Sequence, residues 1–186
     1  MNTPNNTRST ASKTNIHAAF VKLLGRKAPK DISVQEICKM AGVNRTTFYT
    51  YFANIQDLME TIESDLYIEA EKQIIPKTSD IPLLISCGFF VSILNFIRQH
   101  EAIYRIYFSQ NSEARLFNEI EGAINSVFIR ALTSNKNYSE SEFAYIFEFG
   151  KAGTVGIIKK WLFSGCKEPN SILAEQIEKM LQRCLQ

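Results

Sequence analysis

The sequence has few of the residues from which most enzyme sites are built. Its 186 residues include two histidines, His17 and His100, which lie in separate segments. It contains no glycine-rich phosphate loop, no GxSxG nucleophile elbow and no HExxH zinc motif. The four cysteines share no metal-type spacing, so reduced, buried thiols are expected, with redox sensing as the less favoured alternative. We therefore expect no enzyme, no metal and no cofactor.

Long apolar runs are also lacking. The longest uncharged run, residues 81–97, has 17 residues, whereas a membrane span needs about 20. This run contains Ser86, Ser92 and Asn95, so we expect a helix buried in a bundle and no membrane segment. The polar start MNTPNNTRST has no apolar stretch. We therefore expect a cytoplasmic protein without a signal peptide, with residues 1–10 as a flexible arm.

Acidic residues are rare near the start of the chain. The net charge of +2 divides unevenly, because residues 1–56 carry eight basic residues against Asp31 and Glu36. Residues 57–186 carry 13 basic and 17 acidic residues. A basic end on an acidic body is typical of a protein that presents one end to a polyanion such as DNA.

Residues 33–52 contain two helix starts in close succession. Ser33 with Glu36 three residues later forms a capping box, and Asn44 is a second N-cap. Gly42 lies between them, where a sharp corner is expected. Two short helices joined in this way form a helix-turn-helix, whose second helix enters the major groove of DNA.

The second of these helices has two expected faces. Val43, Phe48 and Phe52 are spaced to anchor it on a small core. The remaining side chains carry guanidinium, hydroxyl and phenol groups, which contact phosphates and base edges. With the first turn of the preceding helix, the expected DNA-binding residues are Ser33, Arg45, Thr46, Thr47, Tyr49, Thr50 and Tyr51.

The motifs Ala41-Gly42-Val43, Thr47-Phe48-Tyr49 and Tyr51-Phe52 occur together with apolar positions on the flanking helices. In this combination, residues 13–58 resemble the DNA-binding domain of the TetR family of bacterial transcriptional regulators. Two positions depart from the family pattern. Cys38 stands where the family usually has Ala, and Ile55 stands where it usually has a phosphate-binding Lys, so that contact is not expected here.

Apolar residues recur at helical spacing through the remainder, and no segment alternates in the manner of a strand. The sequence predicts an all-α fold of about nine helices. We expect a three-helix helix-turn-helix domain over residues 11–53 and a helical ligand-binding and dimerisation bundle over 54–186. Helices of the bundle are expected near 54–74, 81–97, 101–109, 113–133, 140–163 and 171–185.

The last two helices are expected to form a homodimer interface. Each has an apolar stripe, and glycines on the first allow close approach of a second helix. In the family that the chain resembles, dimerisation through the final two helices is general. The alternative is that the stripes only close the core of one protomer. The expected interface residues are Gly153, Ile157, Trp161, Leu173, Ile177, Met180 and Leu181.

Aromatic residues are frequent in the middle helices. With a few polar groups they would suit a pocket for a small apolar or aromatic effector, which the family resemblance also implies. The alternative is that they form ordinary core. The expected pocket residues are Phe89, Ser92, Phe96, Tyr104, Phe108, Phe117, Tyr145 and Phe149.

These expectations describe a transcriptional regulator that binds double-stranded DNA as a homodimer on a two-fold symmetric operator. The resemblance favours a ligand-responsive repressor. The alternative is an adaptor or coactivator on DNA that binds a partner protein and has no small-molecule effector.

Overall fold

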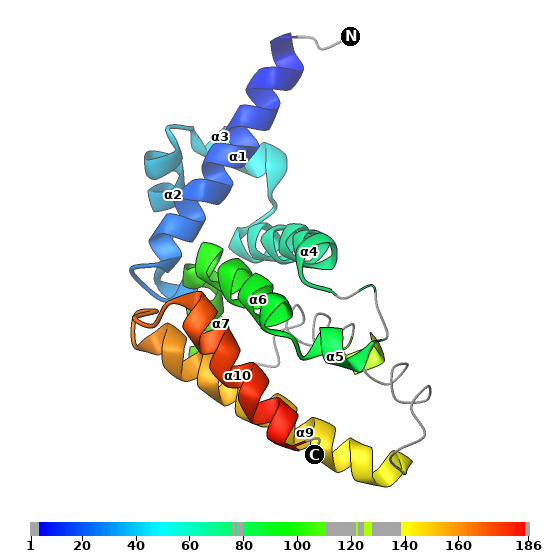
Figure 1. Ribbon diagram of the computed structural model, residues 1–186. Helices are drawn as coiled ribbons and strands as arrows, with labels where there is room; N and C mark the ends of the chain where they lie inside the picture. Colours follow the sequence, from blue (N-terminus) through cyan, green and yellow to red (C-terminus); the bar gives the residue numbers. More distant parts are fainter. Residues whose placement is uncertain are drawn as a thin grey trace. The chain divides into compact units, whose positions relative to one another are not determined.

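The computed structural model describes residues 4–75, 77, 80–110, 122, 125–127 and 139–184. Among these residues every regular element is helical, which confirms the all-α fold (Figure 1). The chain divides into two compact units. The first, called the head below, comprises Met1–Leu66 and Ala102–Gln110. The second, called the body, comprises Tyr67–Glu101 and Asn111–Gln186.

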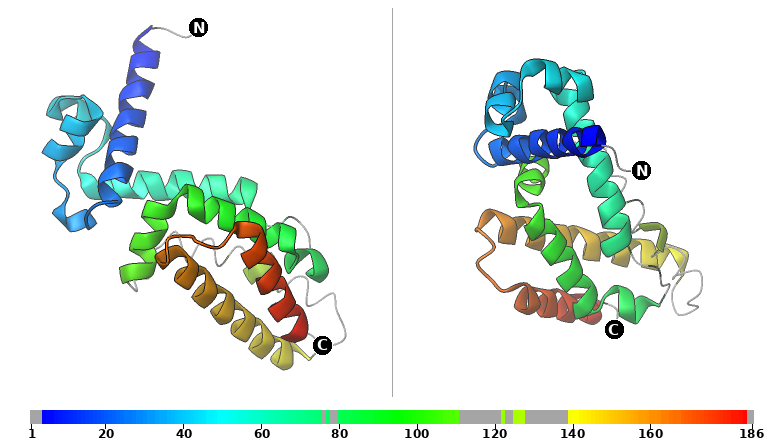
Figure 2. Two further views of the ribbon diagram at one scale, coloured as in Figure 1. Left: turned by 60° about the vertical axis from the view of Figure 1, so that its left-hand side comes forward. Right: turned by 90° about the horizontal axis from the view of Figure 1, so that it is seen from above.

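The head is built around α1 (Pro4–Leu24), α2 (Val34–Ala41) and α3 (Arg45–Tyr51), with the short 3₁₀ helix η1 (Pro29–Asp31) between α1 and α2. Helix α1 packs against both α2 and α3 (Figure 2). Full burial of a large apolar side chain stabilises a fold by about 1.5–3 kcal/mol. The large side chains most completely buried in this core are Ile16, Phe20, Ile37, Phe48, Phe52, Leu58 and Ile62.

Helix α1 begins earlier than expected. Residues 4–10, expected to be part of a flexible arm, form the first turns of α1 in this structure. Pro4 stands at the first helical position, where its fixed φ suits a helix and its missing N–H has no intrahelical acceptor to lose. Further along, the Thr14 hydroxyl donates to the Thr10 carbonyl at 2.9 Å.

The two predicted helix starts are present. The Ser33 hydroxyl accepts from the Glu36 N–H at 3.3 Å, and the Glu36 carboxylate accepts from the Ser33 N–H at 2.9 Å. The Asn44 side chain accepts from the Thr47 N–H at 2.7 Å. Between them, Gly42 ends α2 at φ 68°, a left-handed conformation that favours glycine. The helix-turn-helix layout is therefore confirmed.

The head extends past the boundary expected between residues 53 and 54. Helix α4 (Ile55–Gln73) belongs to the head up to its middle, and α7 (Glu101–Gln110) joins the same unit. The Tyr107 hydroxyl on α7 donates to Glu63 on α4 at 2.5 Å. Burial, together with this bond to a carboxylate, raises the pKa of Tyr107. The apolar face that α7 buries consists of Ile103, Tyr104, Tyr107 and Phe108.

The described part of the body contains the end of α4, α5 (Ile81–Leu84), α6 (Cys87–Gln99), α9 (Glu140–Phe163) and α10 (Asn170–Cys184). Helices α6 and α10 lie side by side, and the side-chain amide of Asn170 donates to the side-chain oxygen Oδ1 of Asn95 at 2.6 Å. The core of this unit includes Phe90, Leu94, Phe96, Ile97, Ile158, Trp161, Leu162, Leu173, Ala174 and Ile177.

The apolar run over residues 81–97 was predicted to be one helix, and that prediction is wrong. The structure has two helices there, α5 and α6. The chain breaks after α5, and the Ser86 hydroxyl accepts from the Phe89 N–H at 3.3 Å, so that Ser86 caps α6. Serine favours this capping position over a helix interior. The stretch Pro82–Gln99 is apolar enough to cross a membrane by length and composition alone, a test that buried core helices also pass, and 39% of it is buried.

The helix predicted near residues 113–133 lies outside the described residues, apart from 122 and 125–127. Phe117, expected in the effector pocket, also lies outside them.

Candidate nucleic-acid interface

The inner face of α3 is fixed by the core of the head. Phe48 is fully buried and packs against the ring of Phe52, with 5.7 Å between the ring centroids. Val43 is half-buried at the corner before the helix. This face holds the orientation of α3 relative to α1 and α2, as predicted, and leaves the opposite face to solvent.

The outer face of α3 carries the polar side chains that the sequence assigned to DNA. Arg45, Thr46 and Thr50 are exposed, and Tyr49 is 50% exposed. The rings of Tyr49 and Phe48 meet edge to face, so Tyr49 lies against the core while its other side reaches solvent. A rigid aromatic side chain held in this way presents its hydroxyl at a defined place.

Thr47 and Tyr51 are less exposed than the others. The Thr47 hydroxyl donates to Asn44 at 2.9 Å, and the Thr50 hydroxyl donates to the Thr46 carbonyl at 2.9 Å. Both hydroxyl protons therefore have acceptors within the helix, and their oxygens remain as acceptors. Tyr51 lies beside Phe52 at 6.4 Å between ring centroids.

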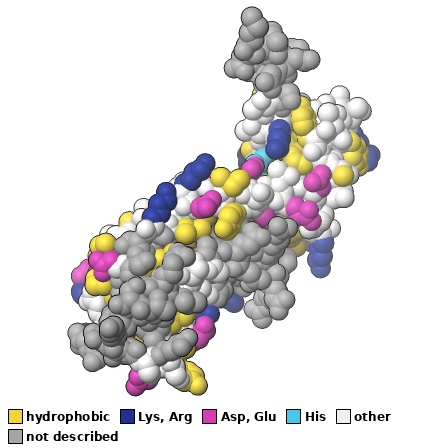
Figure 3. Space-filling model, turned by 90° about the vertical axis from the view of Figure 1, so that its right-hand side faces the viewer, with side chains coloured by type: hydrophobic (Ala, Val, Ile, Leu, Met, Phe, Trp, Pro, Cys, Tyr) yellow, Lys and Arg dark blue, Asp and Glu magenta, His cyan; other side chains and the backbone are white. Residues whose placement is uncertain are grey.

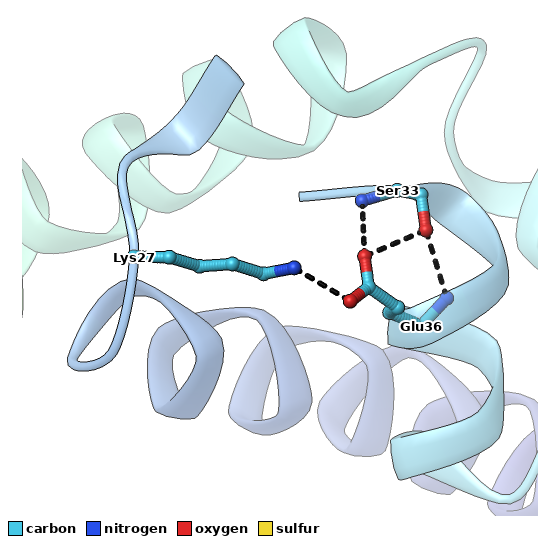
Figure 4. Close-up of polar contacts among 3 residues, drawn as sticks. All are labelled: Lys27, Ser33 and Glu36. Atoms are coloured by element: carbon cyan, nitrogen blue, oxygen red, sulfur yellow. Dashed lines mark hydrogen bonds and ion pairs between the residues drawn. The ribbon is translucent and has the colours of Figure 1, made fainter. Parts of the chain in front are cut away.

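At the start of α2, Ser33 is exposed, but its hydroxyl is used by the capping box. It donates to Glu36 Oε2 at 2.7 Å and accepts from the Glu36 N–H (Figure 4). A contact between the Ser33 hydroxyl and DNA would have to replace these bonds. The amides of Val34 and Gln35, in the same first turn, have no acceptor within the helix.

Lys27, in the turn after α1, also joins this network. Its Nζ lies 2.5 Å from Glu36 Oε1. Figure 4 draws this contact beside the capping box. The Lys27 ammonium and the Ser33 donors lower the pKa of Glu36 from its ordinary value of 4.5 to about 2. The turn after α1 is therefore tied to the first turn of α2 by the Lys27–Glu36 ion pair. The three capping contacts lie within the start of α2 itself.

Two further polar residues on α2 were not among those predicted from the sequence. Gln35 and Lys39 are exposed, and their spacing of four residues sets them on one face of α2. The buried pair Ile37 and Cys38 defines the opposite face, and this pattern is the one by which the sequence could have identified them. Burial raises the pKa of the Cys38 thiol, and the nearby positive charge of Arg45 opposes the rise.

Ile55, which stands where relatives usually have a Lys, is the first residue of α4 and is half-buried. Its neighbour Asn54 accepts from the Asp57 N–H at 2.9 Å, and Asp57 accepts from the Ala53 N–H at 2.7 Å. The start of α4 is thus well capped and carries no cation at this position.

The residues expected to line an effector pocket are not brought together in one unit. Phe89, Ser92 and Phe96 lie on α6 in the body, whereas Tyr104 and Phe108 are buried in the head. Tyr145 and Phe149 on α9 are 77% and 69% exposed, and their assignment to a pocket stays a prediction.

The residues expected at a dimer interface divide into buried and exposed ones. Trp161, Leu173 and Ile177 are buried within the protomer, because they pack in the core of the body. Gly153 and Met180 are exposed, and Ile157 and Leu181 are half-buried. The first three therefore belong to the core, which the sequence left as the alternative reading of these stripes.

A different face of α9 is apolar and exposed. Its residues lie along one side of the helix, with exposed Lys160 between Gly156 and Phe163, and we call this the α9 stripe. The neighbouring α10 adds exposed Ile172 and Met180. Exposed hydrophobic side chains also lie among charged ones on the face drawn in Figure 3. The α9 stripe consists of Tyr145, Phe149, Ala152, Gly153, Gly156 and Phe163.

Solved structures share this fold at low sequence identity. One is the dihydroxyacetone kinase operon activator DhaS, with 21% identity, a TM-score of 0.62, and coverage of 92% of this chain and 94% of that one. A TetR transcriptional regulator from Streptococcus agalactiae 2603V has 20% identity, a TM-score of 0.65, and coverage of 95% and 97%. A tetR-family regulator from Streptomyces coelicolor has 15% identity, a TM-score of 0.67, and coverage of 92% and 81%.

Two family models match the sequence itself. Residues 16–62 match the model for bacterial regulatory proteins of the tetR family, and residues 88–183 match a model described as a transcriptional regulator C-terminal region. A comparison with curated proteins finds no match. The second model covers more than half of the chain, and together the two place it, by its residues and its fold, as a member of the TetR family of bacterial transcriptional regulators.

Proposed function

We propose that the protein binds a two-fold symmetric DNA operator as a homodimer, with α3 in the major groove. The observation that supports this most is the outer face of α3, which is polar, carries Arg45 and is held in place by a buried inner face. A recognition helix needs both properties, because base contacts depend on fixed geometry.

Within this proposal the residues of α3 divide by role. Arg45 and Thr46, at the start of the helix, reach base edges, for which a guanidinium is suited by its bidentate geometry. Tyr49, Thr50, Tyr51 and Thr47 bind phosphates together with backbone amides near Ser33. Gln35 and Lys39, exposed on α2, join the phosphate contacts.

The dimer is proposed to form through the α9 stripe and the exposed apolar residues of α10. An apolar face of several turns, with Gly153 and Gly156 among its exposed positions, allows two helices to approach closely. A two-fold axis would then bring the same stripe from each protomer together, as in other isologous dimers. Such symmetry matches an operator made of two half-sites.

We propose that the protein is cytoplasmic and that it represses transcription. A dimer bound across a promoter excludes polymerase, and an effector relieves this only if it favours a form of the dimer that binds DNA poorly. The candidate effector contacts that remain in the body are Phe89, Ser92 and Phe96 on α6.

A second function is favoured by one specific observation. Tyr145 and Phe149 are strongly exposed, which suits a protein partner better than a small ligand. One structural relative carries the name of an operon activator. In this alternative the protein is an adaptor or coactivator on DNA, and part of the α9 stripe receives the partner.

The proposed function is tested by selecting bound sequences from random DNA with the purified protein. Recovery of a site with two inverted half-sites about 34 Å apart supports a dimeric reader. Recovery of a single half-site, or no enrichment, contradicts it. Thermal shift against a metabolite panel then separates the two functions, because only the repressor predicts stabilisation together with release from DNA.

A further inference from the structure

Glu36 is an unusual residue for its place. It is one of two acidic residues among residues 1–56, and it lies in the first turn of α2 with its side chain 45% exposed. The capping box holds the carboxylate at this end of the helix, so the charge cannot turn away without loss of the cap. On a surface that binds DNA, a fixed negative charge repels the phosphate backbone.

Lys27 is placed to cancel this charge. Its Nζ lies on Oε1 of the carboxylate, whereas the two Ser33 donors bind Oε2, so both oxygens of Glu36 are occupied (Figure 4). Lys27 comes from a different segment, nine residues earlier in the chain, and its side chain is only 28% exposed. A lysine held against a carboxylate in this way has less of its ammonium available to DNA than an exposed one.

We propose that Lys27 supports DNA binding by neutralising Glu36, and not by contacting DNA itself. This inference rests on the proposed function, since it assigns a positioning role within the same interface. Phosphates near the start of α2 then meet a neutral pair, and the cap that shapes the helix-turn-helix keeps its carboxylate without a cost in DNA affinity.

The test uses the full-length protein and five variants with altered charge. Lys27→Met removes the ammonium and keeps an apolar stem, while Glu36→Gln removes the carboxylate and keeps a residue that can complete a capping box. The double variant combines them. Lys30→Met, alone and with Glu36→Gln, is the matched control, because Lys30 is an exposed lysine of the same connection between α1 and α2. Affinity is measured by fluorescence anisotropy on the selected operator and on a random-sequence duplex, with folding checked by circular dichroism.

Lys27→Met is expected to weaken binding about three- to tenfold at low salt on both DNAs, as one uncompensated charge near phosphates should. The double variant is expected to return to near wild-type affinity. Lys30→Met is expected to weaken binding by the same factor in the wild-type and Glu36→Gln backgrounds. A Lys27→Met variant that binds like the wild type, or a double variant as weak as Lys27→Met, overturns the inference. The second result would indicate a direct phosphate contact.

If Lys27→Met does not fold, the DNA affinity of Glu36→Gln alone tests the inference. A gain in affinity supports the inference, and an unchanged or lower affinity overturns it. Absence of DNA binding by the wild-type protein is a separate outcome, because it contradicts the proposed function itself.

Discussion

The head and the body each contain a helix that begins with a capping box, yet the outer faces of these two helices differ. A Ser-x-x-Glu capping box starts α2 in the head, at Ser33, and α9 in the body, at Ser139. In the head, the capped helices bury their apolar faces and expose mainly polar side chains, with Met40 and Tyr49 also exposed. In the body, α9 buries one apolar face and exposes another, the α9 stripe. Caps therefore decide where helices start, but not what their outer faces bind.

The largest expected effect is a difference in stability between two phenylalanine-to-alanine variants, one in each unit. Phe48→Ala in the head is expected to lower the free energy of unfolding by about 3–5 kcal/mol, because the ring is fully buried. Phe149→Ala in the body, where the ring is 69% exposed, is expected to change it by less than about 1 kcal/mol in the dissociated protomer. Urea unfolding at low protein concentration measures both, and equal losses would remove the distinction between the two faces.

The next prediction concerns the α9 stripe. Phe149→Glu places a charge in the proposed interface and is expected to convert dimers to monomers, with operator affinity reduced roughly tenfold or more because two heads no longer bind together. Lys167→Gln, in the exposed turn after α9, is the control, because it changes the net charge by the same one unit. Sedimentation velocity gives the oligomeric state. A Phe149→Glu variant that stays dimeric would place the interface elsewhere.

A third prediction compares two tyrosines. Tyr107→Phe removes the bond from α7 to Glu63 and is expected to cost about 1–2 kcal/mol of stability, as for a part-buried hydrogen bond to a carboxylate. Tyr145→Phe in the body is expected to cost nothing measurable, because Tyr145 is 77% exposed. Thermal unfolding of the two variants is the measurement. Equal stability of Tyr107→Phe and the wild type would mean that α7 is held by apolar packing alone.

The smallest expected effect is on the way in which thermal stability changes with pH. The pKa of Glu36 is lowered to about 2, so its contribution is fully present above pH 4.5 and is lost as the pH falls toward 2. The pKa of Glu142 is also lowered, by Ser139 alone, without a lysine. Glu36→Gln should therefore reduce the acid sensitivity of thermal unfolding more than Glu142→Gln does. The reverse order would show that Lys27 adds little to the cap.

The sequence predicted the head well because several local effects agree there. Ser33, Gly42 and Asn44 each specify a backbone conformation. Phe48 and Phe52 are both buried, so they turn one face of α3 toward the core. The tie between Lys27 and Glu36 was not predicted, since the spacing of nine residues matches no helical period. It depends on how the turn after α1 folds back onto α2.

The body was harder to predict because its apolar residues outnumber the positions that one core needs. The stripe of Trp161, Leu173 and Ile177 has the periodicity of an interface, but these side chains fill the protomer. Tyr145 and Phe149 have the composition of a pocket wall, yet they are exposed. Periodicity identifies an apolar face and cannot tell which of two faces meets the core, because that depends on contacts between helices distant in sequence.

The reading role of α3 is tested most directly by comparing Arg45→Ala and Tyr49→Phe on the selected operator and on a random-sequence duplex. Arg45→Ala is expected to lose about 1–3 kcal/mol on the operator and much less on random DNA, so that sequence preference is relaxed. Tyr49→Phe is expected to weaken both equally. An equal loss on every DNA for Arg45→Ala, or no loss for either variant, would contradict the assignment of α3 as the recognition helix.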